Sequence, residues 1–165
     1  MSHGISYNEK KQKARENARE SRKQEDEPMA AVSELLRTEA DGTISFGDYT
    51  KAEKSKLDNF EYGGDLYKVK TYKEITKLEK NGMFVYESVP GTAVWNFNAK
   101  DSGVHFRVEG PEDAEITIGL AEETEYEVHV AGEIAGQMKT NLGGKLTLSV
   151  ELGDVDAVEI EIIKK

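Results

Sequence analysis

The sequence predicts a mainly β protein built as an antiparallel β-sandwich, and two observations support this fold class. From residue 43 onward, apolar side chains recur at every second position in short runs, which is the spacing of strands that bury one face. Turn residues separate these runs at intervals of about 8 to 12 residues, as in sandwiches and barrels. The chain has no cysteine, so packing between the two β-layers has to hold the fold without disulfide bonds.

Residues 1–28 are predicted to form a charged arm outside the core. Between Glu9 and Glu27 the chain has seven basic and six acidic residues, and its apolar members there are Ala14 and Ala18. A helix in this segment would have no face to bury, although its helix propensity is high. We therefore expect a disordered or frayed-helical arm.

Residues 29–42 are predicted to form a short helix that docks on the sandwich. Pro28 stands where the first turn of a helix tolerates proline, and Asp41-Gly42 is a stop signal. Three apolar side chains would share one side of this helix: Val32, Leu35 and Leu36. Their spacing is typical of contacts with a core, and a helix that binds a partner is the alternative.

Residues 43–165 are predicted to form the sandwich domain. Its clearest alternating runs are Val104, Phe106, Val108; Ile116, Ile118, Leu120; Tyr126, Val128, Val130; Leu146, Leu148, Val150, Leu152; and Val158, Ile160, Ile162. Its turn signals are Asn81-Gly82, Pro90-Gly91, Gly110-Pro111 and Gly143-Gly144. Over residues 72–80 the apolar spacing also fits a helical turn, but the Asn-Gly that follows favours a hairpin strand.

The net charge of −10 disfavours two classes of partner. Nucleic acids are bound by clustered lysines and arginines, and the surfaces of anionic membranes attract basic segments. We therefore expect no nucleic-acid partner and no membrane partner. The first thirty residues contain no apolar run of signal-peptide length, and no stretch approaches the roughly 18 apolar residues of a membrane span. These features predict a cytoplasmic protein.

The segment from Gly119 to Val130 resembles the corner that enters strand F of fibronectin type III and related immunoglobulin-like domains. In that family the pattern is Gly-Leu, a proline, a threonine and then Tyr-x-Val-x-Val. The resemblance implies that Tyr126 buries its ring and hydrogen-bonds back to nearby backbone, while Leu120 fills the core. Glu122 stands where the family favours proline.

Residues 130–152 are similar to the closing hairpins of bacterial immunoglobulin-like accessory modules. With the preceding corner, the resemblance covers residues 119–152. It implies the fold and a bacterial origin, but sandwiches of this kind have many unrelated functions, so it does not specify an activity.

Five residues are candidates for ligand binding: Trp95, His105, Arg107, Glu127 and His129. Each histidine occupies the outward register of its strand, so the last four would share one surface if their strands pair in a suitable register. A metal or general-base role is the alternative for the histidines, but no HExxH spacing, third ligand or nucleophile accompanies them. We therefore expect no metal and no cofactor.

Aromatic residues cluster in the middle third of the chain, where they offer flat faces on which sugar rings stack. They are Tyr62, Tyr67, Tyr72, Tyr86, Trp95 and Phe97. Trp95 and Phe97 share one register with Ala93, which favours burial in a core over exposure.

The sequence favours a non-catalytic module that binds a protein or a carbohydrate, through a sheet face or through the loops after Gly82 and Gly91. One alternative is a small glycan-processing enzyme that uses two carboxylates from the region between Glu112 and Glu125. A second is a scaffold protein whose N-terminal arm folds on a partner. The sequence does not predict the oligomeric state.

Overall fold

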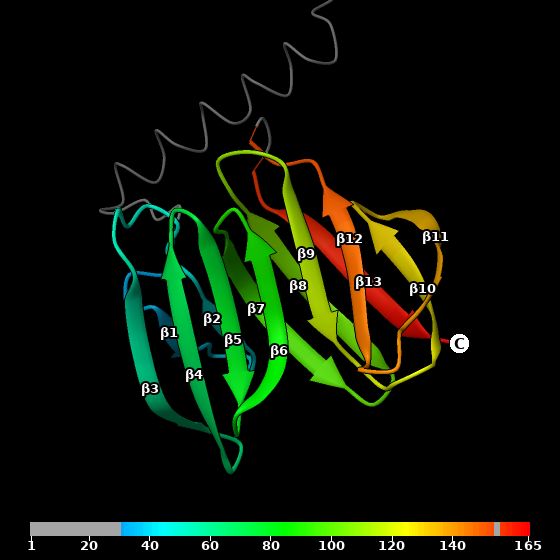
Figure 1. The fold of residues 1–165 in the computed structure, drawn as a ribbon, viewed down its shortest axis with the longest axis horizontal. Helices are drawn as coiled ribbons and strands as arrows, with labels where there is room; N and C mark the ends of the chain where they lie inside the picture. The colour runs from blue at the N-terminus through cyan, green and yellow to red at the C-terminus, as the bar shows by residue number, and fades with distance from the viewer. Residues whose placement is uncertain (1–30, 154–155) are drawn as a thin grey trace, which may run out of the picture.

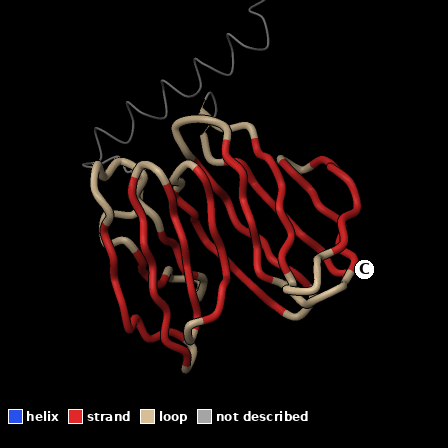
Figure 2. The backbone as a smooth tube through the Cα atoms, in the orientation of Figure 1, coloured by secondary structure: helices blue, strands red, loops and turns tan. Residues whose placement is uncertain are grey.

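The computed structural model describes residues 31–153 and 156–165, so the arm expected over residues 1–28 lies outside the described residues. Over these residues the chain forms thirteen strands and no helix (Figures 1 and 2). The strands make two sheets in which every pairing is antiparallel. The predicted mainly β sandwich is confirmed.

The two sheets lie face to face, with the six-stranded sheet in front in Figure 1. The seven-stranded sheet has the order β1 (Leu36–Thr38), β2 (Ile44–Phe46), β7 (Ala93–Lys100), β8 (Gly103–Glu109), β13 (Val158–Lys164), β10 (Glu125–Val130), β11 (Glu133–Lys139). The six-stranded sheet has the order β12 (Lys145–Val150), β9 (Ala114–Gly119), β6 (Met83–Val89), β5 (Ile75–Lys80), β4 (Asp65–Tyr72), β3 (Ser55–Tyr62).

The two halves of the chain build these sheets differently. From β3 to β6 the chain runs back and forth within the six-stranded sheet through short hairpins. From β8 to β13 it crosses between the sheets four times, and the hairpin of β10 and β11 is the one pair of successive strands here that stays in the same sheet. The C-terminal half therefore joins the two layers.

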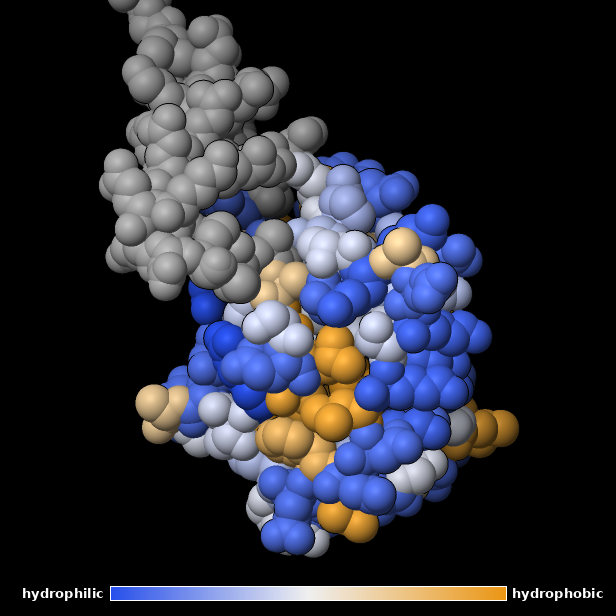
Figure 3. All heavy atoms as spheres, turned by 90° about the vertical axis from the view of Figure 1, so that its left-hand side faces the viewer, coloured by the Kyte–Doolittle hydropathy of each residue, from blue (hydrophilic) through white to orange (hydrophobic). Residues whose placement is uncertain are grey.

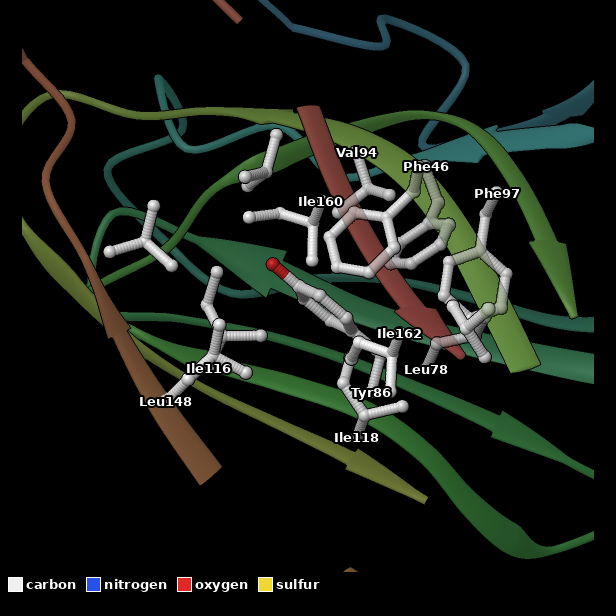
Figure 4. Packing of buried hydrophobic residues seen from close by; sticks show 14 of the residues in the cluster. Phe46, Leu78, Tyr86, Val94, Phe97, Ile116, Ile118, Leu148, Ile160 and Ile162 are labelled. Atoms are coloured by element: carbon white, nitrogen blue, oxygen red, sulfur yellow. The ribbon is translucent and has the colours of Figure 1, made fainter. Parts of the chain in front are cut away.

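The core lies between the inner faces of the two sheets and is centred on Tyr86, whose side chain is fully buried. Its ring meets those of Phe46, Phe97 and Phe106 edge-on, with centroid distances of 5.3, 6.5 and 5.9 Å. Figure 4 shows aliphatic side chains of both sheets packed around these rings. Burying one large apolar side chain contributes roughly 1.5–3 kcal/mol, so this cluster is a main source of stability.

Buried hydroxyl groups satisfy one another beside this cluster. Thr92 Oγ1 lies 2.7 Å from Tyr86 Oη and 2.7 Å from Ser88 Oγ. Thr76 Oγ1 donates to the Thr92 carbonyl at 2.8 Å and lies 2.8 Å from Thr71 Oγ1. These bonds fix the segment between β6 and β7 against the core, because a buried hydroxyl without a partner is costly.

The short helix expected over residues 29–42 is not found in its described part. Residues 36–38 form β1 instead, which pairs with β2, and Leu35 has a positive φ of 72° that no helix would accept. Asp41 and Gly42 belong to the turn of this hairpin, where Asp41 Oδ1 accepts a hydrogen bond from Thr43 N at 3.1 Å. The three apolar residues are therefore covered by strand pairing and the core, and their spacing alone does not distinguish that from a helical face.

The expected strands after residue 43 are present. Most side chains of the five alternating runs are buried, and Leu120, Val130 and Val158 are half-buried at the margin of the core. Residues 72–80 include the strand β5, as expected. Asn81 and Gly82, with φ of 51° and 81°, form the two-residue turn that joins β5 to β6.

Candidate functional site

One end of the sandwich opens into a pocket of about 440 Å³, here called the end pocket. It lies between the β5–β6 turn and the ends of β3, β7 and β9, so residues from both sheets line it. Its lining includes Tyr62, Tyr67, Asn81, Met83, Phe84, Phe97 and Asn98. This volume lies within the range of roughly 300–1,000 Å³ that is usual for small-ligand sites.

Two tyrosines form one wall of the end pocket. The rings of Tyr62 and Tyr67 meet edge-on with centroids 5.8 Å apart, and Tyr62 Oη donates to the carbonyl of Gly42. Burial, with smaller contributions from Asp65 and Tyr62, raises the pKa of the Tyr67 hydroxyl above its usual value. Tyr67 therefore stays neutral and presents a hydroxyl that can both donate and accept a hydrogen bond.

The turn beside the end pocket is held in place by its own side chain. Asn81 Oδ1 accepts a hydrogen bond from Leu66 N at 2.9 Å, and Asn81 Nδ2 donates to Asp65 Oδ1 at 2.8 Å. Lys80 Nζ lies 3.7 Å from Asp65 Oδ2. The rim is thus organised before any ligand binds, which reduces the entropy lost on binding.

Asn98 and Met83 remain available for contacts at this end. The Asn98 side chain makes no hydrogen bond to another described residue, and Met83 is 71% exposed. Asn98 stands directly opposite His105 and also borders the hollow beside that histidine. Leu66 and Leu142, which adjoin pocket residues in sequence, are also exposed. The hydrophobic effect favours the burial of exposed apolar side chains by a partner. This end of the sandwich therefore offers both a hydrogen-bonding amide and an apolar contact surface.

Further apolar side chains gather between the edges of the two sheets on the side of β1 and β3 (Figure 3). Leu35, Leu57, Phe60 and Tyr62 are the partly buried residues that pack against the core there. Tyr62 belongs both to this edge and to the end pocket.

Four of the predicted site residues lie on the outer face of the seven-stranded sheet. His105 and Arg107 are on β8, Glu127 and His129 are on β10, and β13 lies between the two strands. Glu161 of β13 stands directly opposite both histidines. The four residues thus share one face, but an intervening strand that the sequence did not reveal keeps β8 and β10 from pairing.

Each histidine has a carboxylate neighbour of its own. His105 Nε2 lies 2.8 Å from Glu159 Oε2, and His129 Nε2 lies 3.0 Å from Glu127 Oε1. Within residues 31–153 and 156–165, no three His, Cys, Asp or Glu side chains are grouped so as to hold a metal ion. His105 also borders a hollow of about 370 Å³ that contains no aromatic side chain.

Trp95 is half-buried and also faces outward, so the expectation of a core tryptophan is wrong. A register shift between Trp95 and Asn98 on β7, where Asn96 has a positive φ of 55°, directs Phe97 into the core and leaves Trp95 opposite Arg107. Trp95 Nε1 donates to Glu109 Oε1 at 3.1 Å, and the guanidinium of Arg37 lies 5.5 Å from the ring centroid. Arg107 in turn donates to Asn96 Oδ1 at 2.8 Å.

The acidic residues considered for catalysis do not form one group. Those of the β8–β9 turn and those of the β9–β10 loop stand at opposite ends of β9, which at about 3.4 Å per residue spans nearly 20 Å. Asp113 borders a hollow of about 900 Å³ with Glu133 and Glu151. No aromatic side chain lines that hollow among the described residues.

The sequence indicated some residues of the end pocket but not the pocket itself. The aromatic cluster of the middle third includes Tyr62, Tyr67 and Phe97, and the loop after Gly82 was a predicted contact region. Met83, Phe84 and Asn98 were missed, because only the pairing of distant strands brings them beside the tyrosines. The available signal was an Asn-Gly turn followed directly by the apolar residues Met83, Phe84 and Val85.

The protein is thus a β-sandwich with a pocket at one end that Tyr62, Tyr67 and Phe97 help to line. No protein-family model matches the chain, and no match was found among curated proteins or solved structures. The described residues contain no helix with the length and apolar character that membrane crossing requires.

Proposed function

We propose that the protein is a non-catalytic binding module whose end pocket accepts part of a protein or carbohydrate partner. The observation that carries this proposal is a pocket of about 440 Å³ whose lining includes Tyr62, Tyr67, Phe97, Asn98 and the exposed Met83. Aromatic faces suit a sugar ring or an apolar peptide side chain, and Asn98 can orient either by hydrogen bonding.

The immunoglobulin-like class of the sandwich is part of this proposal. Tyr126 is 2% exposed, and Ala121 N donates to its Oη at 3.2 Å, a contact of the kind made at the tyrosine corner of that family. In the immunoglobulin-like family, strand E pairs with strand B, and strand F lies between strands C and G. The pairing of β9 with β12 and the position of β10 between β13 and β11 support an equivalence of β9, β10 and β11 to strands E, F and G. Under this proposal β12 and β13 would correspond to strands B and C, which precede strand E in the family but follow β9 here.

A glycan-processing enzyme is the second candidate, and one observation favours it. Asp113, Glu133 and Glu151 border the same hollow of about 900 Å³. Paired carboxylates are what glycosidases require. Turnover of a glycan panel by the purified protein, lost in Glu133→Gln or Glu151→Gln, would establish this function in place of the binding module. A panel left intact by the protein would exclude it for those glycans.

The binding module is tested by selecting ligands from glycan and peptide libraries and measuring their affinity for pocket variants. We expect Met83→Ala and Asn98→Ala each to weaken the best ligand about tenfold, which corresponds to about 1.4 kcal/mol. Both side chains lie at the surface of the pocket without structural hydrogen bonds, so the fold should persist.

Val89→Ala is the matched control, because Val89 is another exposed apolar residue of β6 and lies at the opposite end of that strand. Its affinity should equal that of the wild type. The proposal is wrong if selected ligands bind all three variants as tightly as the wild type.

A further inference from the structure

Lysines form a row across the outer face of the six-stranded sheet. Lys56 on β3 stands directly opposite Lys70 on β4, and Lys70 stands directly opposite Lys77 on β5 (strands in Figure 1). Lys68 lies one outward position along β4, opposite Glu79. Residues directly opposite one another on neighbouring strands have Cβ atoms about 4.5–5.5 Å apart, so these positive charges are held close together.

Acidic residues compensate the row only in part, because Glu79 stands opposite Lys68 and Glu87 of β6 stands opposite Lys77. Lys77 Nζ lies 3.7 Å from Glu79 Oε2, whereas Lys56, Lys68 and Lys70 make no ion pair or hydrogen bond to another described residue. The four lysines and Glu79 surround a hollow of about 70 Å³. A water molecule needs roughly 10–15 Å³ by a comparable measure, so the hollow has room for a compact group and not for a long side chain.

Ordinary roles for surface lysines explain only part of this arrangement. Lysine on an edge strand hinders pairing with another chain, which accounts for Lys56 on β3. Lys70 and Lys77 lie on interior strands, where like charges directly opposite each other destabilise a sheet. The chain carries 32 acidic residues, yet Lys70 has a lysine directly opposite it on each of its two neighbouring strands.

We propose that this row, Lys56, Lys68, Lys70 and Lys77, binds a compact oxyanion of the phosphate or sulfate type, either free or as a monoester. Lysine ammonium groups are common point-charge ligands for phosphate, and several together suit an anion of more than one charge. A long polyanion fits less well, because beyond the row it would meet a protein whose net charge is −10.

The test is a titration of the full chain, labelled with ¹⁵N, with inorganic phosphate and separately with sulfate, at a constant ionic strength maintained with chloride. We expect saturable shifts confined to amides of β3, β4 and β5. Lys70→Gln combined with Lys77→Gln should weaken the affinity at least tenfold. Lys139→Gln, which removes the same kind of charge from β11 of the other sheet, should leave it unchanged.

Monoesters and vesicles separate the possible sources of the anion. Binding of a sugar phosphate as tight as that of phosphate, with no binding to vesicles containing anionic lipid, supports the proposal as stated. Preferential binding of vesicles or of nucleic acid contradicts the compact ligand. Shifts that do not saturate, or a loss of affinity in Lys139→Gln equal to that in the double variant, would indicate general charge screening. Either result would contradict an anion site at the lysine row.

Discussion

Thr92 illustrates how single residues in this protein serve several buried groups at once. Its hydroxyl bonds to Tyr86 and Ser88, while its backbone N–H and carbonyl both meet Thr76 Oγ1. The buried hydroxyl of Tyr86 therefore has a hydrogen-bond partner beside the aromatic core. The stability of the core depends on this residue as well as on apolar area.

We expect a substitution of Thr92 to lower the free energy of unfolding more than removal of the Tyr86 hydroxyl does. Tyr86→Phe removes one hydroxyl and leaves the bond between Ser88 and Thr92, so we expect a loss of about 1 kcal/mol in the free energy of unfolding. Thr92→Val leaves two buried hydroxyls without their partner, so we expect a loss of about 2–4 kcal/mol. Urea denaturation measures both, and a larger loss for Tyr86→Phe would contradict this account of the hydroxyl network.

The same tyrosine predicts how stability depends on alkaline pH. Burial raises the pKa of Tyr86 far above its usual value, and burial also raises that of Tyr67. Above pH 10 or thereabouts, the unfolded chain loses these protons while the folded chain keeps them, so stability falls as pH rises. Tyr86 contributes a slope that approaches about −1.4 kcal/mol per pH unit where only the unfolded chain has lost this proton, and Tyr67 adds a contribution of the same sign.

The contribution of Tyr86 is measured by comparing the wild type with Tyr86→Phe in urea denaturation series across this alkaline range. The substitution removes one ionisable group and leaves every other one in place, so the difference between the two proteins isolates Tyr86. We expect the variant to lose stability less steeply. Parallel slopes would mean that Tyr86 does not remain protonated in the folded protein.

At the scale of the elements, most strands could be predicted from the sequence because their apolar residues alternate. The runs on β8, β9, β10, β12 and β13 are long enough to specify one buried face each. Residues 31–42 were misjudged because three apolar residues at helical spacing also fit a short strand and its turn. Trp95 was misjudged because a register shift on β7 exchanges the two faces of the strand.

Two strands also approach each other so closely that only glycine fits between them. A Cβ added to Gly103, where β8 begins, would lie 1.9 Å from the Ile162 carbonyl oxygen on β13, and its φ is 143°. We expect Gly103→Ala to cost more than about 3 kcal/mol in the free energy of unfolding, because it combines a clash with backbone strain.

Gly132 provides the control for this prediction. Its φ of 83° is also positive, but a Cβ there would meet no atom within 4 Å. Gly132→Ala should therefore cost only about 1–2 kcal/mol, the strain of the left-handed conformation. Equal losses of stability for the two variants in thermal or urea unfolding would show that the close approach of β8 to β13 causes no additional destabilisation in Gly103→Ala.

At the scale of the whole molecule, charge and shape are distributed in ways that composition does not reveal. The net charge of −10 coexists with a row of lysines on one sheet face, because cross-strand register decides which charges become neighbours. The end pocket likewise joins residues from β3 to β9 that are far apart in the chain. Sequence periodicity specifies the layers, but the site depends on strand order, which periodicity does not contain.

The binding of a partner at the end pocket is tested most directly by mapping the amide shifts of the ¹⁵N-labelled protein upon addition of its best selected glycan or peptide ligand. The account predicts that the shifts concentrate on residues 80–85, 97–99 and 119–120, which surround the pocket. Shifts centred instead on His105 and His129, or on the hollow beside Asp113, would contradict it.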